Sequence, residues 1–235
     1  MILFPKDIYC ISCEKPILSD NEDSLCDVCR ENLLYNLPKQ CSICGRFLGE
    51  AEKGPICFHC YSDESAYEKG IACTVYAGTV KHVIYRLKYA GQGYLARNIG
   101  AIMYQKAVEL PDFDLIVAAP VHNRKKKQRG YDQAELIAGN LADRMNKKIV
   151  QNNLVRMKET KPMSGLSALE RKRNVEGAFN VARPEEFRNQ TILLVDDILT
   201  SGATCHACSK MLLEQGAERV YVIVFAAAYF DMKMR

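Results

Sequence analysis

The stretch TILLVDDILTSGATCHACSKMLLEQGA, residues 191–217, decides the fold. Its start, residues 191–195, is apolar and rich in strand-favouring residues, and it ends in the adjacent carboxylates Asp196 and Asp197. A short turn of Thr, Ser and Gly then leads into an amphipathic helix over residues 203–215. A buried strand that passes directly into a helix is typical of α/β proteins.

The segments on either side continue this alternation of strand and helix. Apolar runs predict strands over residues 71–77, 114–119 and 219–226, and amphipathic patterns predict helices over residues 79–89, up to about residue 110, and over residues 132–146. Strands that are apolar throughout, with helices between them, indicate a parallel sheet covered on both faces. The sequence therefore predicts an α/β fold with a parallel sheet flanked by helices.

The turn after the two aspartates has the chemistry of a phosphate site. Ligands bind at the carboxyl edge of such sheets, and the helix that starts at Ala203 offers unpaired N–H groups to an anion. Gly202 allows the backbone to approach a phosphate closely. Carboxylates repel phosphate, but Asp196 and Asp197 can accept hydrogen bonds from nearby sugar hydroxyls. We therefore expect a pocket for a ribose that carries a 5-phosphate.

Cysteine pairs dominate the N-terminal part of the chain. Eight of the 11 cysteines form four C-x-x-C pairs, and the last two pairs repeat the first two with an offset of 31 residues. Two such pairs supply the four thiolates of a structural zinc site. We predict two structural Zn²⁺ sites and favour the sharing of each ion by successive pairs, while crosswise pairing stays open. The predicted ligands are Cys10, Cys13, Cys26, Cys29, Cys41, Cys44, Cys57 and Cys60.

Other uses of the cysteines fit the sequence less well. Disulfide bonds need an oxidising compartment, which nothing in the sequence suggests, and thioredoxin-like redox sites usually rest on one C-x-x-C at a helix start. We expect His59 to be a bystander within the last pair. Cys73, Cys205 and Cys208 lie in apolar patterns, so we expect them to be buried, reduced thiols.

The overall composition is that of an ordinary globular protein. With 235 residues, 48% of them hydrophobic and 26% charged, the chain can bury a core, which argues against disorder. The longest apolar run, residues 220–230, is shorter than the roughly 20 residues that a membrane span needs. No secretory signal is visible, so we expect a cytoplasmic protein without membrane insertion. The net charge is only +4, but residues 124–129 form a basic run, which is either a solvated face or a nucleic-acid contact.

Residues 193–204, LLVDDILTSGAT, resemble the phosphoribosyl pyrophosphate (PRPP) loop of type I phosphoribosyltransferases. Walker B strands and response-regulator aspartates lack this hydroxyl-rich turn, and the GxxxxGK[ST] loop is absent. The resemblance implies that Asp196 and Asp197 bind the ribose, that residues 120–130 hold the pyrophosphate, and that Mg²⁺ bridges the two, held mainly by substrate oxygens and water. The implied 5-phosphate residues are Leu199, Thr200, Ser201, Gly202, Ala203 and Thr204, and the implied pyrophosphate residues are Val121, His122, Arg124 and Arg129.

Nearly the whole chain resembles the ComF family of competence proteins, which combine N-terminal zinc ribbons with a phosphoribosyltransferase-like domain. The resemblance is carried by the cysteine pairs, by YRLKYAG around Lys88, by residues 119–138 and by residues 166–179. It implies a double zinc-ribbon domain over residues 1–65 and a type I phosphoribosyltransferase-like domain over residues 66–235. It also implies a role in DNA uptake during natural transformation, with single-stranded DNA and a helicase-like competence ATPase as partners.

Residues 158–166 resemble the mobile loop that closes over phosphoribosyltransferase sites. Asp132 departs from the family pattern: it either adds negative charge beside the pyrophosphate or simply caps its helix. Met163 also departs from that pattern, since glutamine is common there. The residues implied for this closing loop or for DNA contacts are Lys88, Lys125, Lys126, Lys127, Lys161, Arg171 and Asn174.

These patterns lead to one functional hypothesis and two alternatives. The hypothesis is a phosphoribosyltransferase-like protein of DNA uptake that binds PRPP with magnesium and also binds single-stranded DNA. As an enzyme it would displace pyrophosphate from C1 of the ribose with a nitrogen nucleophile. The alternatives are a non-catalytic DNA-binding adaptor that keeps the fold, and a purine salvage enzyme, which leaves the zinc domain unexplained. The sequence identifies no catalytic residue, acceptor or oligomeric state.

Overall fold

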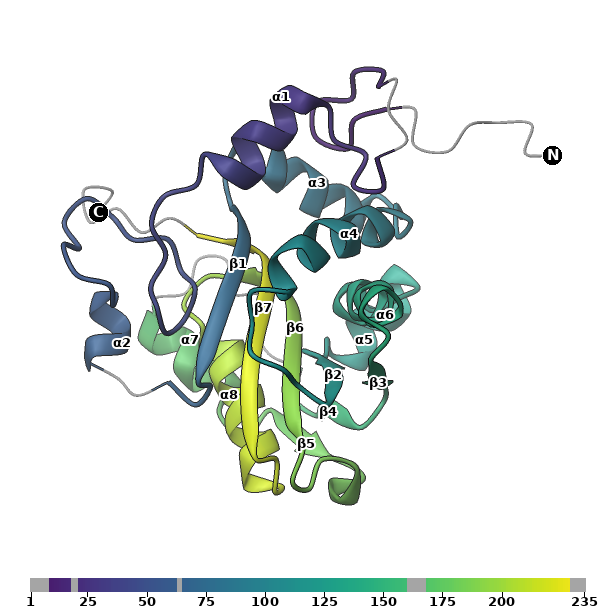
Figure 1. Ribbon diagram of the computed structural model, residues 1–235. Coiled ribbons are helices and arrows are strands. Elements are labelled where there is room, and N and C mark those ends of the chain that lie inside the picture. Colours follow the sequence, from purple (N-terminus) through teal and green to yellow (C-terminus); the bar gives the residue numbers. More distant parts are fainter. Residues whose placement is uncertain (1–8, 18–20, 63–64, 160–167, 229–235) are drawn as a thin grey trace.

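A parallel sheet lies at the centre of the computed structural model, which describes residues 9–17, 21–62, 65–159 and 168–228 (Figure 1). The sheet has five strands in the order β1-β7-β6-β2-β3, and every neighbouring pair is parallel. The predicted parallel α/β sheet is therefore confirmed. The strands are β1 (Lys69–Val75), β2 (Leu115–Ala118), β3 (Lys148–Val150), β6 (Thr191–Leu199) and β7 (Arg219–Ala227).

Strand β6 runs further than the apolar pattern indicates. The predicted strand ends at Val195, whereas the ladder between β6 and β7 continues past the aspartates to the pair Leu199 and Ala227. The polarity of Asp196 and Asp197 hides this extension from a pattern based on apolar residues. Both aspartates therefore lie within the last part of a regular strand, whose pleat sends them to opposite faces of the sheet.

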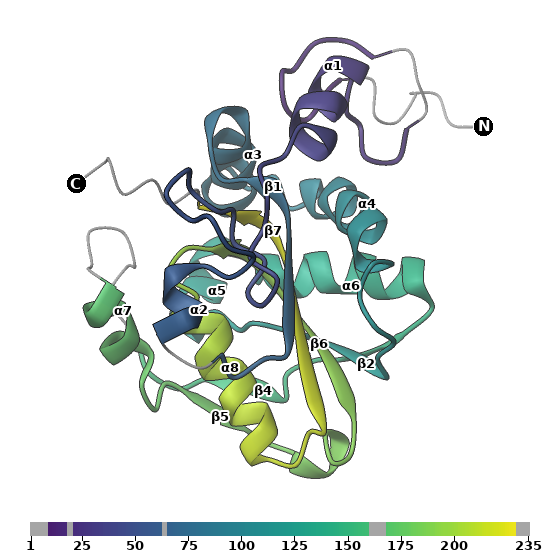
Figure 2. The same cartoon turned by 60° about the vertical axis from the view of Figure 1, so that its left-hand side comes forward.

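Helices cover both faces of the sheet, as predicted (Figure 2). Leu193 and Val195 of β6 share a core with α3 (Gly78–Tyr89), α4 (Leu95–Ala107) and α6 (Gln133–Met145). Ile192 and Leu194 face the other way and share a second core with α8 (Ala203–Glu214). The predicted helices over residues 79–89, 132–146 and 203–215 are confirmed to within a residue or two at each end.

Several short elements carry no periodic signal and were not predicted. The basic run forms a helix, α5 (Asn123–Arg129), and an antiparallel hairpin joins β4 (Leu154–Arg156) to β5 (Phe179–Val181). In sequence, α7 (Ala168–Val175) lies between β4 and β5, and the short 3₁₀ helix η2 (Pro184–Glu186) follows β5. Strands of three residues are too short to show alternation, and α5 has no apolar face. Among the described residues, no helix has the length and apolar character needed to cross a bilayer.

The two cysteine segments repeat one local structure. The first contains α1 (Asp27–Arg30) and the π-helix η1 (Glu31–Tyr35), and the second contains α2 (Phe58–Ser62). Isolated antiparallel bridges pair Tyr9 with Pro16 and Gln40 with Phe47. Glu14 and Gly45 both have positive φ, at 61° and 71°. The helices α1 and α2, the bridges and the positive-φ residues thus recur at the offset that the duplication predicts.

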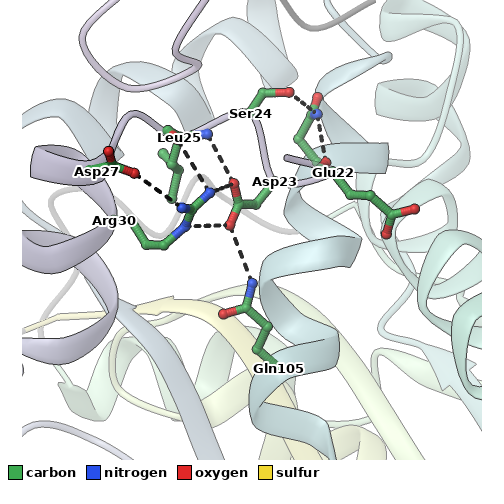
Figure 3. A network of polar contacts seen from close by, with 8 residues as sticks. Glu22, Asp23, Ser24, Leu25, Asp27, Arg30 and Gln105 are labelled. Carbon is green, nitrogen blue, oxygen red and sulfur yellow. Dashed lines mark hydrogen bonds and ion pairs between the residues drawn. The ribbon is translucent and has the colours of Figure 1, made fainter. Parts of the chain in front are cut away.

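The first cysteine segment packs against α4 through a buried carboxylate (Figure 3). Asp23 accepts hydrogen bonds from the guanidinium of Arg30 at 2.7 and 3.0 Å, from the backbone N–H of Leu25 at 3.0 Å, and from Gln105 of α4 at 3.3 Å. Asn98 of α4 donates to Ser24 at 2.7 Å. These charge-assisted bonds fix the segment on the helical face that also contains α3 and α6.

The second cysteine segment covers the free edge of β1. Gln40 exchanges two hydrogen bonds with the backbone of Ala72, at 2.8 and 3.3 Å, and the N–H of Gly70 donates to Ile43 at 2.6 Å. A Cβ atom added at Gly45 would lie 2.6 Å from the backbone of Gly70, so the two chains touch backbone to backbone. An edge strand is thereby paired and shielded. The boundary predicted at residue 65 stays a prediction, since each cysteine segment shares a core with the sheet.

Candidate functional site

The two adjacent aspartates lie in different surroundings. Asp197 points to the face of α3, where its carboxylate forms an ion pair with Lys88. Asp196 points to the face of α8, where the thiol of Cys205 donates to its Oδ2 atom at 4.0 Å. The two are linked because the N–H of Asp197 donates to Asp196 Oδ1 at 2.8 Å. Both carboxylates are buried, so each depends on these few partners.

This burial shifts the protonation of the site. Burial and then the charge of Asp197 raise the pKa of Asp196 well above its ordinary value. Burial alone would lower the pKa of Lys88, but the attraction and hydrogen bond of Asp197 outweigh that effect and raise it. Lys88 is therefore charged at neutral pH, and Asp196 takes up a proton more readily than an ordinary exposed aspartate.

The turn after β6 presents a helix N-terminus at the carboxyl edge of the sheet. Gly202 has a φ of 81° and is the N-cap of α8, which therefore has no capping side chain at that position. Ser201 accepts a hydrogen bond from the N–H of Ala203, at 3.4 Å. The first turn of α8 thus keeps backbone donors for an anion. The residues predicted to bind a 5-phosphate, Leu199, Thr200, Ser201, Gly202, Ala203 and Thr204, all lie in or beside this turn.

A side chain from the second cysteine segment holds the same turn. The guanidinium of Arg46 donates from Nη2 to the backbone carbonyl of Thr200 at 3.0 Å. The carbonyl of Arg46 accepts from the N–H of Cys41 at 2.7 Å, so Arg46 also belongs to the cysteine loop. The sequence analysis missed this residue. Its only local signal is a basic residue directly after a C-x-x-C pair and a glycine, which is too common to interpret.

The segment predicted to hold pyrophosphate leaves the sheet beside the aspartates. The N–H of Ala119 donates to the carbonyl of Val195 at 2.8 Å, which brings Val121 and His122 to the same edge. Type I phosphoribosyltransferases are expected to hold pyrophosphate in a loop, but most of residues 120–130 form a helix here, α5 (Asn123–Arg129). His122 caps this helix by accepting from the N–H of Arg124 at 3.3 Å, and Gly130 ends it with a φ of 88°.

The carboxylate of Asp132 joins the start of this segment to the N-terminus of α6. Its carboxylate caps α6, accepting from Ala134 at 3.0 Å and from Glu135 at 3.3 Å, and it also accepts from the N–H of Val121 at 2.9 Å. The capping interpretation is confirmed. Burial raises the pKa of Asp132. Its charge is satisfied by backbone donors, so it sets the position of the turn rather than opposing an anion directly.

The basic side chains near α5 divide into two groups. Lys125 is half-buried, and burial and the charges of Arg156 and Arg129 lower its pKa, which indicates a cluster of cations. Burial lowers the pKa of Arg156, on β4, and the charges of Cys208 and Asp196 partly offset this effect. No sequence pattern indicated this residue. Arg129 of this cluster also lies over the ring of Tyr89. The other cations lie elsewhere: Arg124 pairs with Glu159 at 3.1 Å, Lys126 pairs with Glu135 at 2.6 Å, and Lys127 is exposed.

Only part of the predicted closing loop falls within the described residues. Lys158 donates to the carbonyl of Glu176 at 3.1 Å, whereas Lys161 and Met163 lie outside the described residues. Arg171 and Asn174 both lie in α7, and the side chain of Asn174 is half-buried. The role of this segment stays a prediction.

A cavity of about 720 Å³ opens beside the turn between β6 and α8. Ser201, Gly202 and Ala203 form one wall, and the second cysteine segment contributes Arg46 to another. Tyr67, which precedes β1, and Phe179 of β5 complete it with apolar surface. The cavity is thus lined by residues next to the sheet on one side and by the second cysteine segment on the other.

The eight predicted zinc ligands form two clusters of four. Within each cluster, all the sulfur atoms lie within 4.8 Å of one another, so two cysteine tetrads can hold zinc ions. The N–H of Cys57 donates to the sulfur of Cys41 at 3.3 Å, a contact that stabilises a thiolate. Successive pairs share a cluster, so the favoured pairing is confirmed and crosswise pairing is wrong. The clusters are Cys10, Cys13, Cys26 and Cys29, and Cys41, Cys44, Cys57 and Cys60.

The other cysteines behave as the sequence predicts. Cys73, Cys205 and Cys208 are buried and free. Burial raises the pKa of the Cys205 and Cys208 thiols, with the charge of Asp196 adding to the effect. These groups are therefore neutral neighbours of Asp196. His59 belongs to neither cysteine cluster.

Comparisons with known proteins agree with this arrangement. A protein-family model described as the phosphoribosyl transferase domain matches residues 132–231. Competence protein F of Haemophilus influenzae is 27% identical over 227 residues, covering 93% of this chain and 96% of that protein. DNA utilization protein YhgH of Escherichia coli is 26% identical and covers 84% and 94%, and competence protein ComFC of Bacillus subtilis is 22% identical and covers 83% and 80%.

Solved structures of phosphoribosyltransferases are also similar to parts of the chain. Adenine phosphoribosyltransferase from Thermoanaerobacter pseudethanolicus is 19% identical and covers 63% of this chain and 86% of its own, with a TM-score of 0.37. Glutamine PRPP amidotransferase from B. subtilis covers 55% and 25% at 18% identity, with a TM-score of 0.39. The sequence matches and the cysteine clusters carry the assignment. The chain is a homologue of competence protein F and ComFC, with a phosphoribosyl transferase domain and two N-terminal four-cysteine clusters that fit a double zinc ribbon.

Proposed function

We propose that this protein binds PRPP together with Mg²⁺ and acts in DNA uptake. The observation that carries the proposal is the acid pair at the end of β6, followed at once by the N-terminus of α8, whose N-cap residue is Gly202. A sugar with neighbouring hydroxyls and a phosphate matches that pair of features. The relatives named for competence and DNA utilization supply the biological context.

Each part of the donor has a partner in this proposal. The 5-phosphate lies against the turn from Leu199 to Thr204, and the ribose hydroxyls donate to Asp196 and Asp197. The pyrophosphate lies near Val121 and His122, within reach of the cations. Mg²⁺ would bind together with PRPP, held mainly by ligand oxygens and water, and would supply positive charge against the pyrophosphate.

The ion pair between Lys88 and Asp197 gives binding a specific consequence. When ribose hydroxyls donate hydrogen bonds to the Asp197 carboxylate, they replace part of its interaction with Lys88. Lys88 can then turn toward the pyrophosphate, whose negative charge it neutralises. In a transfer reaction, a nucleophile would attack C1 while the bond to pyrophosphate breaks, and this cation would stabilise the charge that develops on the leaving group. The acceptor stays unassigned.

The domain and partner hypotheses belong to the same proposal. The double zinc ribbon spans residues 1–65 and the phosphoribosyltransferase-like domain spans residues 66–235. The protein acts in the cytoplasm on incoming single-stranded DNA, beside a helicase-like ATPase. The main alternative is a DNA-binding adaptor that uses the fold only for recognition.

Isothermal titration calorimetry tests the proposal. PRPP and Mg²⁺ are titrated into the zinc-loaded protein and into the double variant Asp196→Asn/Asp197→Asn. Asp143→Asn, which removes an exposed carboxylate on α6, is the matched control. We expect the control to bind like the wild type and the double variant to lose binding while retaining its zinc content and cooperative unfolding. Equal affinity in all three proteins would contradict the assignment.

A further inference from the structure

Two segments of the chain contain no acidic residue over an unusual length. Residues 69–108 contain no aspartate or glutamate and six lysines or arginines, and residues 115–131 also contain none, with a further five basic residues. With 28 acidic residues in a chain of 235, such gaps favour positive charge, although Glu14 pairs with Arg86, Glu159 with Arg124 and Glu135 with Lys126.

The fold joins these two segments into one surface. The hydroxyl of Tyr131 donates to the carbonyl of Leu87 in α3, and the guanidinium of Arg129 lies 5.5 Å from the ring centre of Tyr89. The ring of Tyr131 also packs against Gly93, where an added Cβ atom would approach it to 3.2 Å. The outer side of α3, the start of α4 and the end of α5 are therefore continuous.

Three exposed tyrosines lie on this surface within ten residues of sequence. Tyr85, Tyr89 and Tyr94 are 57%, 69% and 63% exposed. The rings of Tyr85 and Tyr89, one helical turn apart on α3, have centroids 5.4 Å apart. Single exposed aromatic residues are unremarkable, but a group of them beside cations is characteristic of a binding surface.

We propose that this tyrosine surface, formed by Tyr85, Tyr89 and Tyr94 with Arg129 and the exposed cations of α5, binds single-stranded nucleic acid. Unpaired bases stack on the tyrosine rings, while the cations neutralise the phosphates. Arg129 can contribute to both interactions, because it already lies over Tyr89. The inference rests on the proposed function in DNA uptake and names the surface that receives the strand.

The position of this surface links it to the PRPP site. Tyr89 follows Lys88 directly, and Lys88 forms the ion pair with Asp197. The tyrosine surface and the proposed donor site therefore lie on different sides of the same helix, α3. The tyrosines favour a single strand over a duplex, because the faces of paired bases are already stacked and leave only phosphates for an exposed ring to meet.

Fluorescence anisotropy with a labelled oligothymidine of about 20 nucleotides tests the proposal. The full-length, zinc-loaded protein is titrated without PRPP, at low and moderate salt, so that the result is independent of donor binding. Tyr85→Ala/Tyr89→Ala removes the stacked pair, and Tyr85→Phe/Tyr89→Phe keeps the rings. Tyr61→Ala, in α2 of the second cysteine segment and 84% exposed, is the control.

We expect the alanine pair to weaken binding about tenfold or more, by analogy with base stacking in other single-strand sites, and the phenylalanine pair and the control to bind like the wild type. A duplex of the same length should bind more weakly and be insensitive to the alanine pair. Equal binding by the alanine pair and the wild type, or no binding of the oligothymidine at low salt, would overturn the proposal. So would a duplex that binds as tightly as the single strand.

Discussion

Arg46 and Thr200 are 154 positions apart in sequence, yet the guanidinium of Arg46 donates to the Thr200 carbonyl at 3.0 Å. The donor belongs to the second cysteine loop, and the acceptor belongs to the turn proposed to bind the 5-phosphate. A charged donor that is itself buried holds a carbonyl more firmly than water does. The cysteine segment is therefore part of the structure that shapes the phosphate turn, in addition to covering the edge of the sheet.

We predict that Arg46→Ala weakens PRPP binding about tenfold while the zinc content stays the same. Loss of a hydrogen bond to a charged group costs about 1.5–3 kcal/mol, and part of that cost appears as disorder of the turn. Calorimetric titration of PRPP with Mg²⁺ measures the effect. Lys53→Ala, which removes an exposed cation from the same segment, should bind like the wild type. Unchanged affinity in Arg46→Ala would show that the turn keeps its shape without this contact.

The two cysteine clusters should differ in their effect on the site. Cys57→Ser and Cys29→Ser each remove one thiolate, from the second and the first cluster respectively. We expect each variant to lose one equivalent of zinc and to unfold at a lower temperature, because structural zinc contributes directly to folding. Only Cys57→Ser should also weaken PRPP binding, since the second cluster contains the Arg46 loop. Zinc analysis, thermal unfolding and calorimetry on both variants check this, and equal PRPP affinities would contradict it.

The sequence predicted the elements whose signals are local. The strand, acid pair, turn and helix between Thr191 and Glu214 follow one another directly, so their order and chemistry are visible without any tertiary information. The cysteine clusters are equally local, because the spacing within each pair sets the ligand geometry and the duplication suggests the pairing.

The remaining features depend on contacts between distant segments. Arg46 and Arg156 reach the site from segments that have no motif in common with it. The partner of Asp197 was also hidden, because Lys88 lies on a helix, 109 positions before Asp197, and was assigned to the closing loop or to DNA contacts. Helix α5 was missed because its sequence, NRKKKQR, has no apolar period and its ends are set by His122 and Gly130.

The close approach of the second cysteine segment to β1 makes Gly70 sensitive to substitution. A Cβ atom there would lie 2.7 Å from the carbonyl oxygen of Cys44, which is too close for the backbone to accept without moving. We predict that Gly70→Ala destabilises the protein by about 2–4 kcal/mol, the range for strongly disruptive buried substitutions. Gly54→Ala is the control: an added Cβ atom there would meet no other part of the protein within 4 Å, so the melting temperature should stay nearly unchanged. Similar melting temperatures for Gly70→Ala and the wild type would contradict the packing described here.

Asp196 should make the ligand-free protein less stable as the pH rises. Burial and the charge of Asp197 raise its pKa in the folded state, so the folded protein binds a proton that the unfolded chain has already released. The stability that this proton confers is fully present below the unfolded pKa, which is about 3.9, and is lost as the pH rises through the folded pKa. Once the pH exceeds the folded pKa, the charged, buried Asp196 is therefore a cost to the fold.

Asp196→Asn removes that cost, so we predict that the variant melts about 3 °C higher than the wild type at pH 7 although it binds PRPP less well. An asparagine oxygen can still accept the hydrogen bond from the N–H of Asp197. The gain should shrink toward pH 4, as the wild-type carboxyl becomes protonated. Thermal unfolding across this range measures the difference, with Asp143→Asn as the exposed control. A variant that is less stable than the wild type at pH 7 would contradict this prediction. It would mean that the buried carboxylate stabilises the ligand-free fold, rather than costing it stability that sugar hydroxyls could restore.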